Sequence, residues 1–124
     1  MATGKGQRGQ AVVEFALVLP LVVLFALVVL QAALVGKDAL LVHHAAREAA
    51  RAAAVEPDPA VARRAALAAG GLDAGRLSSR LTGGNGRGDR TTATVTYRSP
   101  TNVPLVGRFV GDIELHAAVT MRVE

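Results

Sequence analysis

The fold is decided by residues 15–35, which read FALVLPLVVLFALVVLQAALV and contain one side chain able to hydrogen-bond, Gln31. An α-helix rises about 1.5 Å per residue, so this stretch spans roughly 32 Å, close to the ~30 Å hydrocarbon thickness of a bilayer. A buried core helix is the other reading. The remaining residues, however, are rich in Ala, Gly and Arg and supply too few large apolar side chains to enclose it. The stretch therefore predicts a transmembrane helix.

The composition narrows the class of protein. The 124 residues make at most one modest domain; 51% of them are apolar, 3% are aromatic, and none is Cys or Trp. The lack of Cys excludes disulfide frameworks, thiolate zinc sites and Cys nucleophiles. A large enzyme, a zinc finger and a disulfide-stapled secreted domain are therefore excluded.

The net charge of +4 is spread along the chain. Lys5 and Arg8 precede the apolar run, and the arginines after it are scattered among acidic residues. Nucleic-acid binding favours basic residues gathered on one face with stacking aromatics, whereas the lone Tyr97 lies in a strand-like stretch, so no nucleic-acid partner is predicted. Basic residues beside a span favour the cytoplasm, so Lys5 and Arg8 place the N-terminus there and the C-terminal region outside.

The helix is expected to continue beyond the membrane. Nothing after the apolar run breaks a helix before Val55, so we expect one rod from about Ala11 to Val55. Its residues 10–36 would cross the membrane, and residues 37–56 would extend beyond it. This continuity, the length of the apolar run and the lack of a clean Ala-x-Ala site directly after it disfavour a cleaved secretory signal peptide. Pro20 lies in the first half of the span, where we expect it to kink the helix.

Residues 57–124 are expected to form a small extracytoplasmic domain. Pro57 ends the rod, and Asp58 is typical of an N-cap for a short helix that Pro59 opens and that ends near Ala69. Alternating apolar and polar residues predict strands, the first of them weakly, over residues 76–82, 91–97 and 113–123. The expected fold is α+β, with a small antiparallel sheet laid on the Ala-rich part of the long helix.

Two connections in this domain carry residues that invite functional interpretations. Residues 82–89 are Gly-rich, but no apolar strand, Gly-Lys-Ser/Thr end or helix accompanies them, which disfavours a phosphate-binding loop. Their Arg87-Gly88-Asp89 tripeptide matches an adhesion motif. Three such residues arise easily by chance in a loop rich in Gly and Arg, so an adhesion role is disfavoured. Pro100 and Pro104 predict a loop whose apolar side chains cover a sheet edge or touch a membrane: Leu105, Val106, Phe109 and Val110.

The sequence contains no pattern of residues that is typical of a catalytic site. An enzyme needs a nucleophile with a base, paired carboxylates or a metal cluster, and no such pattern is present. His43 and His44 are adjacent, so they point about 100° apart on a helix, whereas sharing a metal needs a spacing of i to i+4. We therefore predict no enzymatic activity, no cofactor, no metal site and no small-molecule substrate.

Glu14 is the unusual residue of the N-terminal region. A carboxylate deep in a membrane helix is unfavourable, by roughly 2.5–3.5 kcal/mol for Asp on insertion scales, so such residues are rare and usually functional. Gly9, four residues, Glu14-Phe15 and then an aliphatic helix resemble the cleavage and assembly signal of type IV prepilins and pseudopilins.

Two longer stretches narrow this resemblance. Residues 8–21, RGQAVVEFALVLPL, and residues 45–51, AAREAAR, are similar to the TadE-like family of Tad (Flp-type) pilus-assembly proteins. Residues 115–124 resemble the final strand of that family. The resemblance thus implies a pseudopilin-like fold, with a membrane helix packed by a small sheet outside the membrane.

The resemblance also implies roles for individual residues. A membrane prepilin peptidase would cleave after Gly9, removing residues 1–9 as a cytoplasmic leader and leaving Gln10, free or methylated, as the new N-terminus. Glu14, followed by Phe15, would be the assembly carboxylate, because the new amine lies one helical turn, about 6 Å, away. In a bundle, Glu14 can pair instead with a neighbour's amine and so fix the axial register. The later stretch is characteristic of the family, but the resemblance gives its charged residues no role. They form a solvated face or are candidate helix-packing or partner contacts: Arg47, Glu48 and Arg51.

The predicted function is structural. The chain would be a pseudopilin-like subunit in the biogenesis of a Tad pilus at the bacterial cytoplasmic membrane, acting by helix and subunit association. Its partners would be the membrane, the prepilin peptidase and other Tad pilus subunits and assembly proteins. The alternative is a single-pass, membrane-anchored extracytoplasmic binding or adhesion module unrelated to pili.

Overall fold

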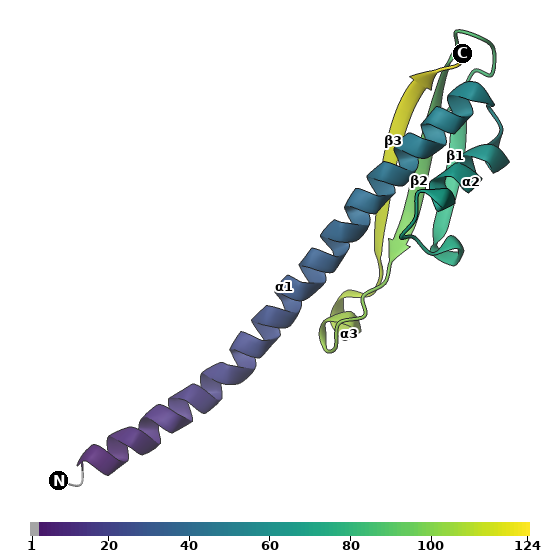
Figure 1. Ribbon diagram of the computed structural model, residues 1–124. Helices are drawn as coiled ribbons and strands as arrows, with labels where there is room; N and C mark the ends of the chain where they lie inside the picture. The colour runs from purple at the N-terminus through teal and green to yellow at the C-terminus, as the bar shows by residue number, and fades with distance from the viewer. Residues whose placement is uncertain (1–2) are drawn as a thin grey trace.

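The computed structural model describes residues 3–124, with side chains described from residue 6 onward. A long N-terminal helix carries a small sheet domain at its C-terminal end (Figure 1). In chain order the elements are α1 (Thr3–Val55), α2 (Pro59–Ala68), the 3-10 helix η1 (Ala74–Arg76), β1 (Leu77–Gly83), β2 (Arg90–Ser99), α3 (Val106–Val110) and β3 (Ile113–Arg122). The predicted α+β class is confirmed.

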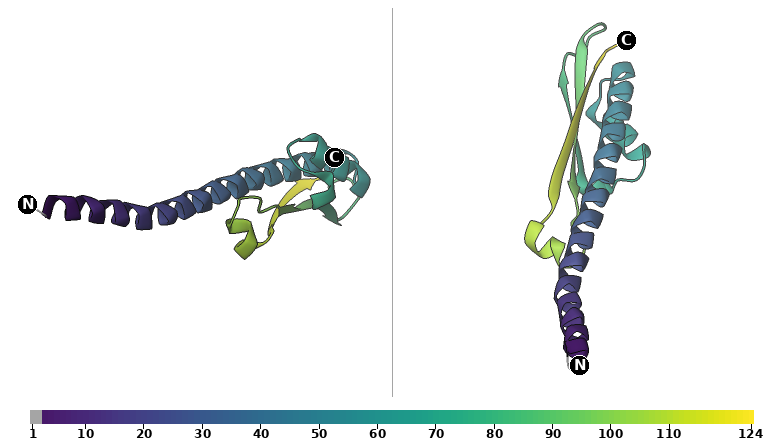
Figure 2. Two further views of the ribbon diagram at one scale, coloured as in Figure 1. Left: turned by 90° about the horizontal axis from the view of Figure 1, so that it is seen from below. Right: turned by 90° about the vertical axis from the view of Figure 1, so that its left-hand side faces the viewer.

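Helix α1 is unbroken from Thr3 to Val55. The predicted start near Ala11 was wrong. An interior Gly disfavours helix by only about 1 kcal/mol relative to Ala, so the glycines that precede Ala11 do not stop it. The helix also continues through Pro20, and Figure 2 shows that its axis bends within its N-terminal half.

The apolar part of α1 projects away from the sheet domain (Figure 1). Within the described part of the chain, α1 is the one helix that is long and apolar enough to cross a membrane, and none of its most apolar stretch is buried. The alternative of a buried core helix is therefore excluded. Such a surface requires lipid or other apolar chains around it, so α1 has the character of a single-pass membrane anchor.

The three strands form one antiparallel sheet in the order β1-β2-β3. Leu77 lies opposite Tyr97, and Val95 lies opposite Ala117, so apolar side chains of neighbouring strands share one face. All three predicted strands are confirmed, with bounds that differ from the prediction by at most two residues. The apolar residues whose side chains are buried on that face are Leu77, Ala93, Val95, Tyr97 and Ala117.

The extramembrane half of α1 packs on this buried face. It contacts β2 and β3, while α2 contacts β1 and α1. Small side chains allow the helix backbone to approach the sheet closely, and the buried stripe of α1 consists of Val42, Ala45, Ala46, Ala49, Ala50 and Ala53. The expected packing of the sheet on the Ala-rich helix is confirmed.

The short helix α2 begins and ends as predicted. The side chain of Asp58 accepts a hydrogen bond from the amide of Ala60 at 2.9 Å, and Pro59 is the first helical residue. Gly70 and Gly71 follow the helix with φ of 89° and 83°, values that favour glycine. A Cβ on Gly71 would also lie 2.8 Å from a methyl carbon of Leu41.

The connection from β2 to β3 differs from the predicted plain loop, because it contains the helix α3. This helix has only five residues, too few to produce a helical periodicity in the sequence. It begins after Leu105, which adopts φ of 69°, and Gly107 lies where a Cβ would clash with the carbonyl oxygen of Thr101. The connection is thus a compact structure, called here the α3 lobe (residues 100–112).

Replacing Ala49 tests how closely α1 and the sheet are packed. The side chain of Ala49 is 0% exposed within the core, so Ala49→Leu should lower the free energy of unfolding by about 1–3 kcal/mol through overpacking. Urea unfolding of the full chain in detergent can be followed by the fluorescence of Tyr97, the single Tyr of the chain. The exposed Ala60 provides the control: Ala60→Leu should change stability by less than about 0.5 kcal/mol. Equal midpoints for the two variants would contradict this packing.

Candidate membrane and assembly site

The residues singled out near the N-terminus all lie on α1 and are all exposed: Gly9, Gln10, Glu14, Phe15 and Pro20. Gln10 and Glu14 are four residues apart, so they lie on one side of the helix, one turn of about 6 Å from each other. Phe15 is rotated from Glu14 by about 100° and is 68% exposed. The structure therefore places the proposed new N-terminus beside the carboxylate along one helix face.

Gly9 has no structural reason to be a glycine. It lies inside a helix, and a Cβ at this position would meet nothing within 4 Å. A glycine there disfavours helix by about 1 kcal/mol relative to Ala. The fold therefore accepts a glycine at this position without requiring one, as it does at Gly6.

Glu14 has no polar partner among the side chains that the structure describes. Its side chain is exposed, and no hydrogen bond or ion pair involves it among residues 6–124. The neighbouring side chains are apolar: Val12, Val13, Phe15 and Leu17 are each more than half exposed. A carboxylate on such a surface needs a partner from solvent, headgroups or another chain.

The candidate contact residues beyond the apolar run have different environments. Arg47 and Arg51 are exposed and one helical turn apart, on the side of α1 that the sheet leaves free. Glu48 is half-buried and lines a shallow hollow between α1 and α2, together with His44 and Ala65. Within the described residues, no ion pair joins Arg47, Glu48 and Arg51, so the two arginines remain available to a partner.

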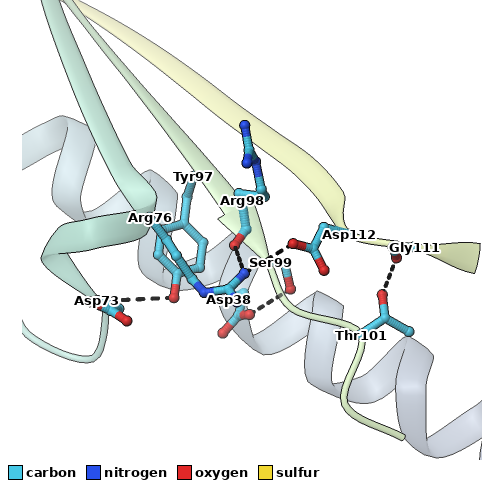
Figure 3. Close-up of polar contacts among 9 residues, drawn as sticks. All are labelled: Asp38, Asp73, Arg76, Tyr97, Arg98, Ser99, Thr101, Gly111 and Asp112. Atoms are coloured by element: carbon cyan, nitrogen blue, oxygen red, sulfur yellow. Dashed lines mark hydrogen bonds and ion pairs between the residues drawn. The ribbon is translucent and has the colours of Figure 1, made fainter. Parts of the chain in front are cut away.

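The sequence analysis did not identify a polar cluster at the α3 end of the sheet (Figure 3). Arg76 donates from Nη1 to Oδ2 of Asp112 and to the carbonyl oxygen of Arg98, both at 3.2 Å. A groove of about 660 Å³ lies beside this pair and is lined also by Asp73 and Glu114. The residues of the pair are far apart in sequence, and only the sheet register brings them together, so no sequence signal could have found them.

The chemistry of this cluster is that of a structural contact. The Arg76 and Asp112 side chains are 35% and 42% exposed, and ion pairs exposed to solvent contribute at most about 1 kcal/mol. The cluster therefore joins the start of β1 to the residue that precedes β3.

A second polar contact fixes the end of β2 to α1. The buried hydroxyl of Ser99 donates to Oδ2 of Asp38 at 2.7 Å (Figure 3). Hydrogen bonds to an ionised carboxylate are about twice as strong as neutral ones. Asp38 lies just beyond the apolar run, so the sheet domain is held where α1 leaves its most apolar part.

The two histidines and the Arg-Gly-Asp tripeptide noted in the sequence show no sign of a binding site. His43 and His44 are both exposed, and residues 3–124 contain no group of three or more side chains arranged to hold a metal ion. Asp89 of the Arg87-Gly88-Asp89 tripeptide accepts a hydrogen bond from the amide of Gly86 at 3.1 Å. Its carboxylate thus stabilises the turn between β1 and β2.

Comparison with known proteins finds a similarity over an N-terminal segment of the chain. Residues 9–51 match the family model described as TadE-like protein. The matched segment runs from Gly9 to Arg51 and contains Glu14, the apolar run and the Ala-rich stretch, so the resemblance found in the sequence is confirmed there. No curated protein and no solved structure matches the chain.

Proposed function

We propose that this TadE-like chain is a pseudopilin-like subunit that takes part in building a Tad (Flp-type) pilus. It acts by association of helices and subunits. The observation that carries the proposal is the largely exposed apolar part of α1. It bears Glu14, which has no polar partner among residues 6–124, one turn from Gln10 inside the family-matched segment. Such a helix is suited to a lipid environment and to lateral packing against identical or related helices.

The proposed orientation follows from charge. Lys5 and Arg8 precede the apolar run, and basic residues beside a span favour the cytoplasmic side. The N-terminus then lies in the cytoplasm, α1 crosses the bacterial cytoplasmic membrane once, and the sheet domain lies outside. Prepilin peptidase would meet Gly9 at the cytoplasmic membrane face.

Cleavage would supply the missing partner of Glu14. Removal of residues 1–9 creates an amine at Gln10, and this amine can neutralise Glu14 within a single subunit. When subunits pack side by side, Glu14 of an incoming subunit can instead meet the amine of a neighbour. A polar pair in apolar surroundings specifies geometry better than it adds stability, so this pair would set the axial register of the helices.

The exposed parts of the extramembrane half would then contact partner subunits. Arg47 and Arg51 lie on the side of α1 that the sheet leaves free. Arginines with this freedom suit bidentate contacts with carboxylates of another subunit. The outer face of the sheet, with Thr92 and Thr120 joined by a 2.7 Å hydrogen bond, is a second polar surface open to partners.

The mass of the mature protein tests the proposal. Chain purified from membranes of cells that make the pilus should have the mass of residues 10–124, with or without one methyl group. A mass that includes residues 2–9, or one that indicates cleavage near Ala33, would contradict the pseudopilin proposal. Either result would favour the alternative of a membrane-anchored or secreted binding module.

A further inference from the structure

One face of the apolar run is covered within the chain. From residue 6 to residue 35, every side chain of α1 is exposed except Leu27, Gln31 and Val35. These three are spaced by four residues, so they form one stripe along the helix. Gln31 is the most deeply buried of them, at 4% exposed.

The α3 lobe accounts best for the cover over this stripe. Helix α3 contacts α1, and Figures 1 and 2 show the lobe beside α1 on the N-terminal side of the sheet. Val103 and Val106 of the lobe are buried, at 4% and 7% exposed. The lobe is closed on itself by a hydrogen bond from the Thr101 hydroxyl to the Gly111 carbonyl (Figure 3). It therefore packs as a unit on a part of α1 that belongs to the apolar run.

The other side of the lobe is apolar and uncovered. Phe109 is 83% exposed, Leu105 56% and Val110 53%, and they are the exposed large apolar residues found outside α1 in the described chain. Arg108 is exposed beside them. This apolar surface is thus concentrated in the segment that reaches the membrane helix.

We propose that the α3 lobe rests in the outer interface of the lipid bilayer, with Leu105, Phe109 and Val110 inserted among the lipids. Residues 11–30 alone would span about 30 Å as a helix, enough to cross the hydrocarbon core. The outer boundary of the hydrocarbon then lies near Gln31, level with the lobe. Apolar side chains in the interface reach about 5–10 Å into the boundary of headgroups and acyl chains, and Arg108 can extend its charge to the headgroups.

Gln31 favours this level over a deeper one. Its side-chain nitrogen and oxygen have no hydrogen-bond partner among the described residues. An unpaired amide in hydrocarbon is unfavourable by several kcal/mol, whereas water and headgroup oxygens are available at the interface. Both atoms are buried, so a hydrogen bond to water requires the side chain or the lobe to move, and such water is close at hand only at the interface.

This proposal depends on α1 crossing a membrane, and it does not depend on cleavage after Gly9 or on pilus assembly. Failure of the lobe to touch lipid would leave the pilus proposal intact. Conversely, an uncleaved chain would leave the lobe proposal intact.

Single tryptophans can measure the depth of the lobe, because the chain contains no Trp. Phe109→Trp would be introduced into the full chain, reconstituted in phosphatidylcholine–phosphatidylglycerol vesicles with and without headgroup-region nitroxide lipids. Phe25→Trp, in the apolar run and 68% exposed, is the control for lipid contact. Val55→Trp, at the far end of α1 and 72% exposed, is the control for water contact.

We expect nitroxide lipids to quench the Phe109→Trp signal at least threefold more than the Val55→Trp signal. Iodide should quench it at least threefold less than the Val55→Trp signal. Iodide quenching equal to that of Val55→Trp, without lipid quenching, would overturn the proposal by placing the lobe in water. Protection from both quenchers would overturn it in favour of cover by a second copy. Absence of lipid quenching at Phe25→Trp would show that α1 does not cross the membrane, and it would overturn the proposal for that reason.

Discussion

Gly9→Leu is expected to produce a folded, membrane-inserted chain that keeps residues 1–9. Leu has room at this position, because a Cβ on Gly9 meets nothing within 4 Å. The substitution should even favour the helix by about 1 kcal/mol, since Leu is a better helix former than Gly. Any loss of maturation therefore reflects recognition of the cleavage site by the peptidase, whose cleft would have to accept a bulky side chain beside the scissile bond.

Gly6→Leu is the matched control. Gly6 lies in the same helix, three residues earlier, and a Cβ there also meets nothing within 4 Å. We expect mass spectrometry of the membrane fraction to find the Gly6→Leu chain matured to residues 10–124 and the Gly9→Leu chain unprocessed. Normal maturation of Gly9→Leu would count strongly against cleavage at this position. A block in both variants would show a general sensitivity of the leader and would not support Gly9 as the specific site.

Glu14→Leu is expected to abolish pili without affecting maturation or membrane insertion. Replacing a carboxylate by Leu makes the apolar segment more favourable in lipid, so a loss of insertion cannot account for a loss of pili. The variant lacks the group that would meet the amine of a neighbouring subunit, and helices packed by apolar contacts alone have no fixed register. Electron microscopy of cells should show few or no pili, and the chain should have the mass of residues 10–124 at its normal abundance.

Two further variants separate charge at this position from charge elsewhere on α1. Glu14→Asp keeps the carboxylate with one methylene less and should retain part of the piliation. Glu56→Leu removes an exposed carboxylate at the C-terminal end of α1 that is not a candidate contact, and it should leave both processing and piliation unchanged. Normal piliation of Glu14→Leu would refute the role given to Glu14, whatever the behaviour of the controls.

Much of the fold could be predicted because its signals are local. The apolar run at residues 15–35 predicts the membrane helix, the Pro57-Asp58-Pro59 sequence predicts the break after it, and two-residue alternation predicts the strands. Each signal depends on the solvation or the backbone preference of residues close in sequence. The extension of α1 to Thr3 and the helix α3 escaped prediction, because glycines in a helix and five-residue helices leave weak patterns.

The candidate site likewise has features that follow from local sequence and features that follow from tertiary packing. The sequence alone determined a long apolar helix, a basic leader, and a carboxylate placed one turn beyond the proposed cleavage point, because the period of an α-helix fixes these spacings. Three features depend on the tertiary structure alone. The side chain of Gln31 is buried, the Ser99 hydroxyl donates a hydrogen bond to Asp38, and the side chain of Phe109 is exposed. Those contacts join residues more than 60 positions apart in some cases. They depend on where the sheet docks along α1, which is set by the packing of small Ala side chains against the strands and not by any local preference.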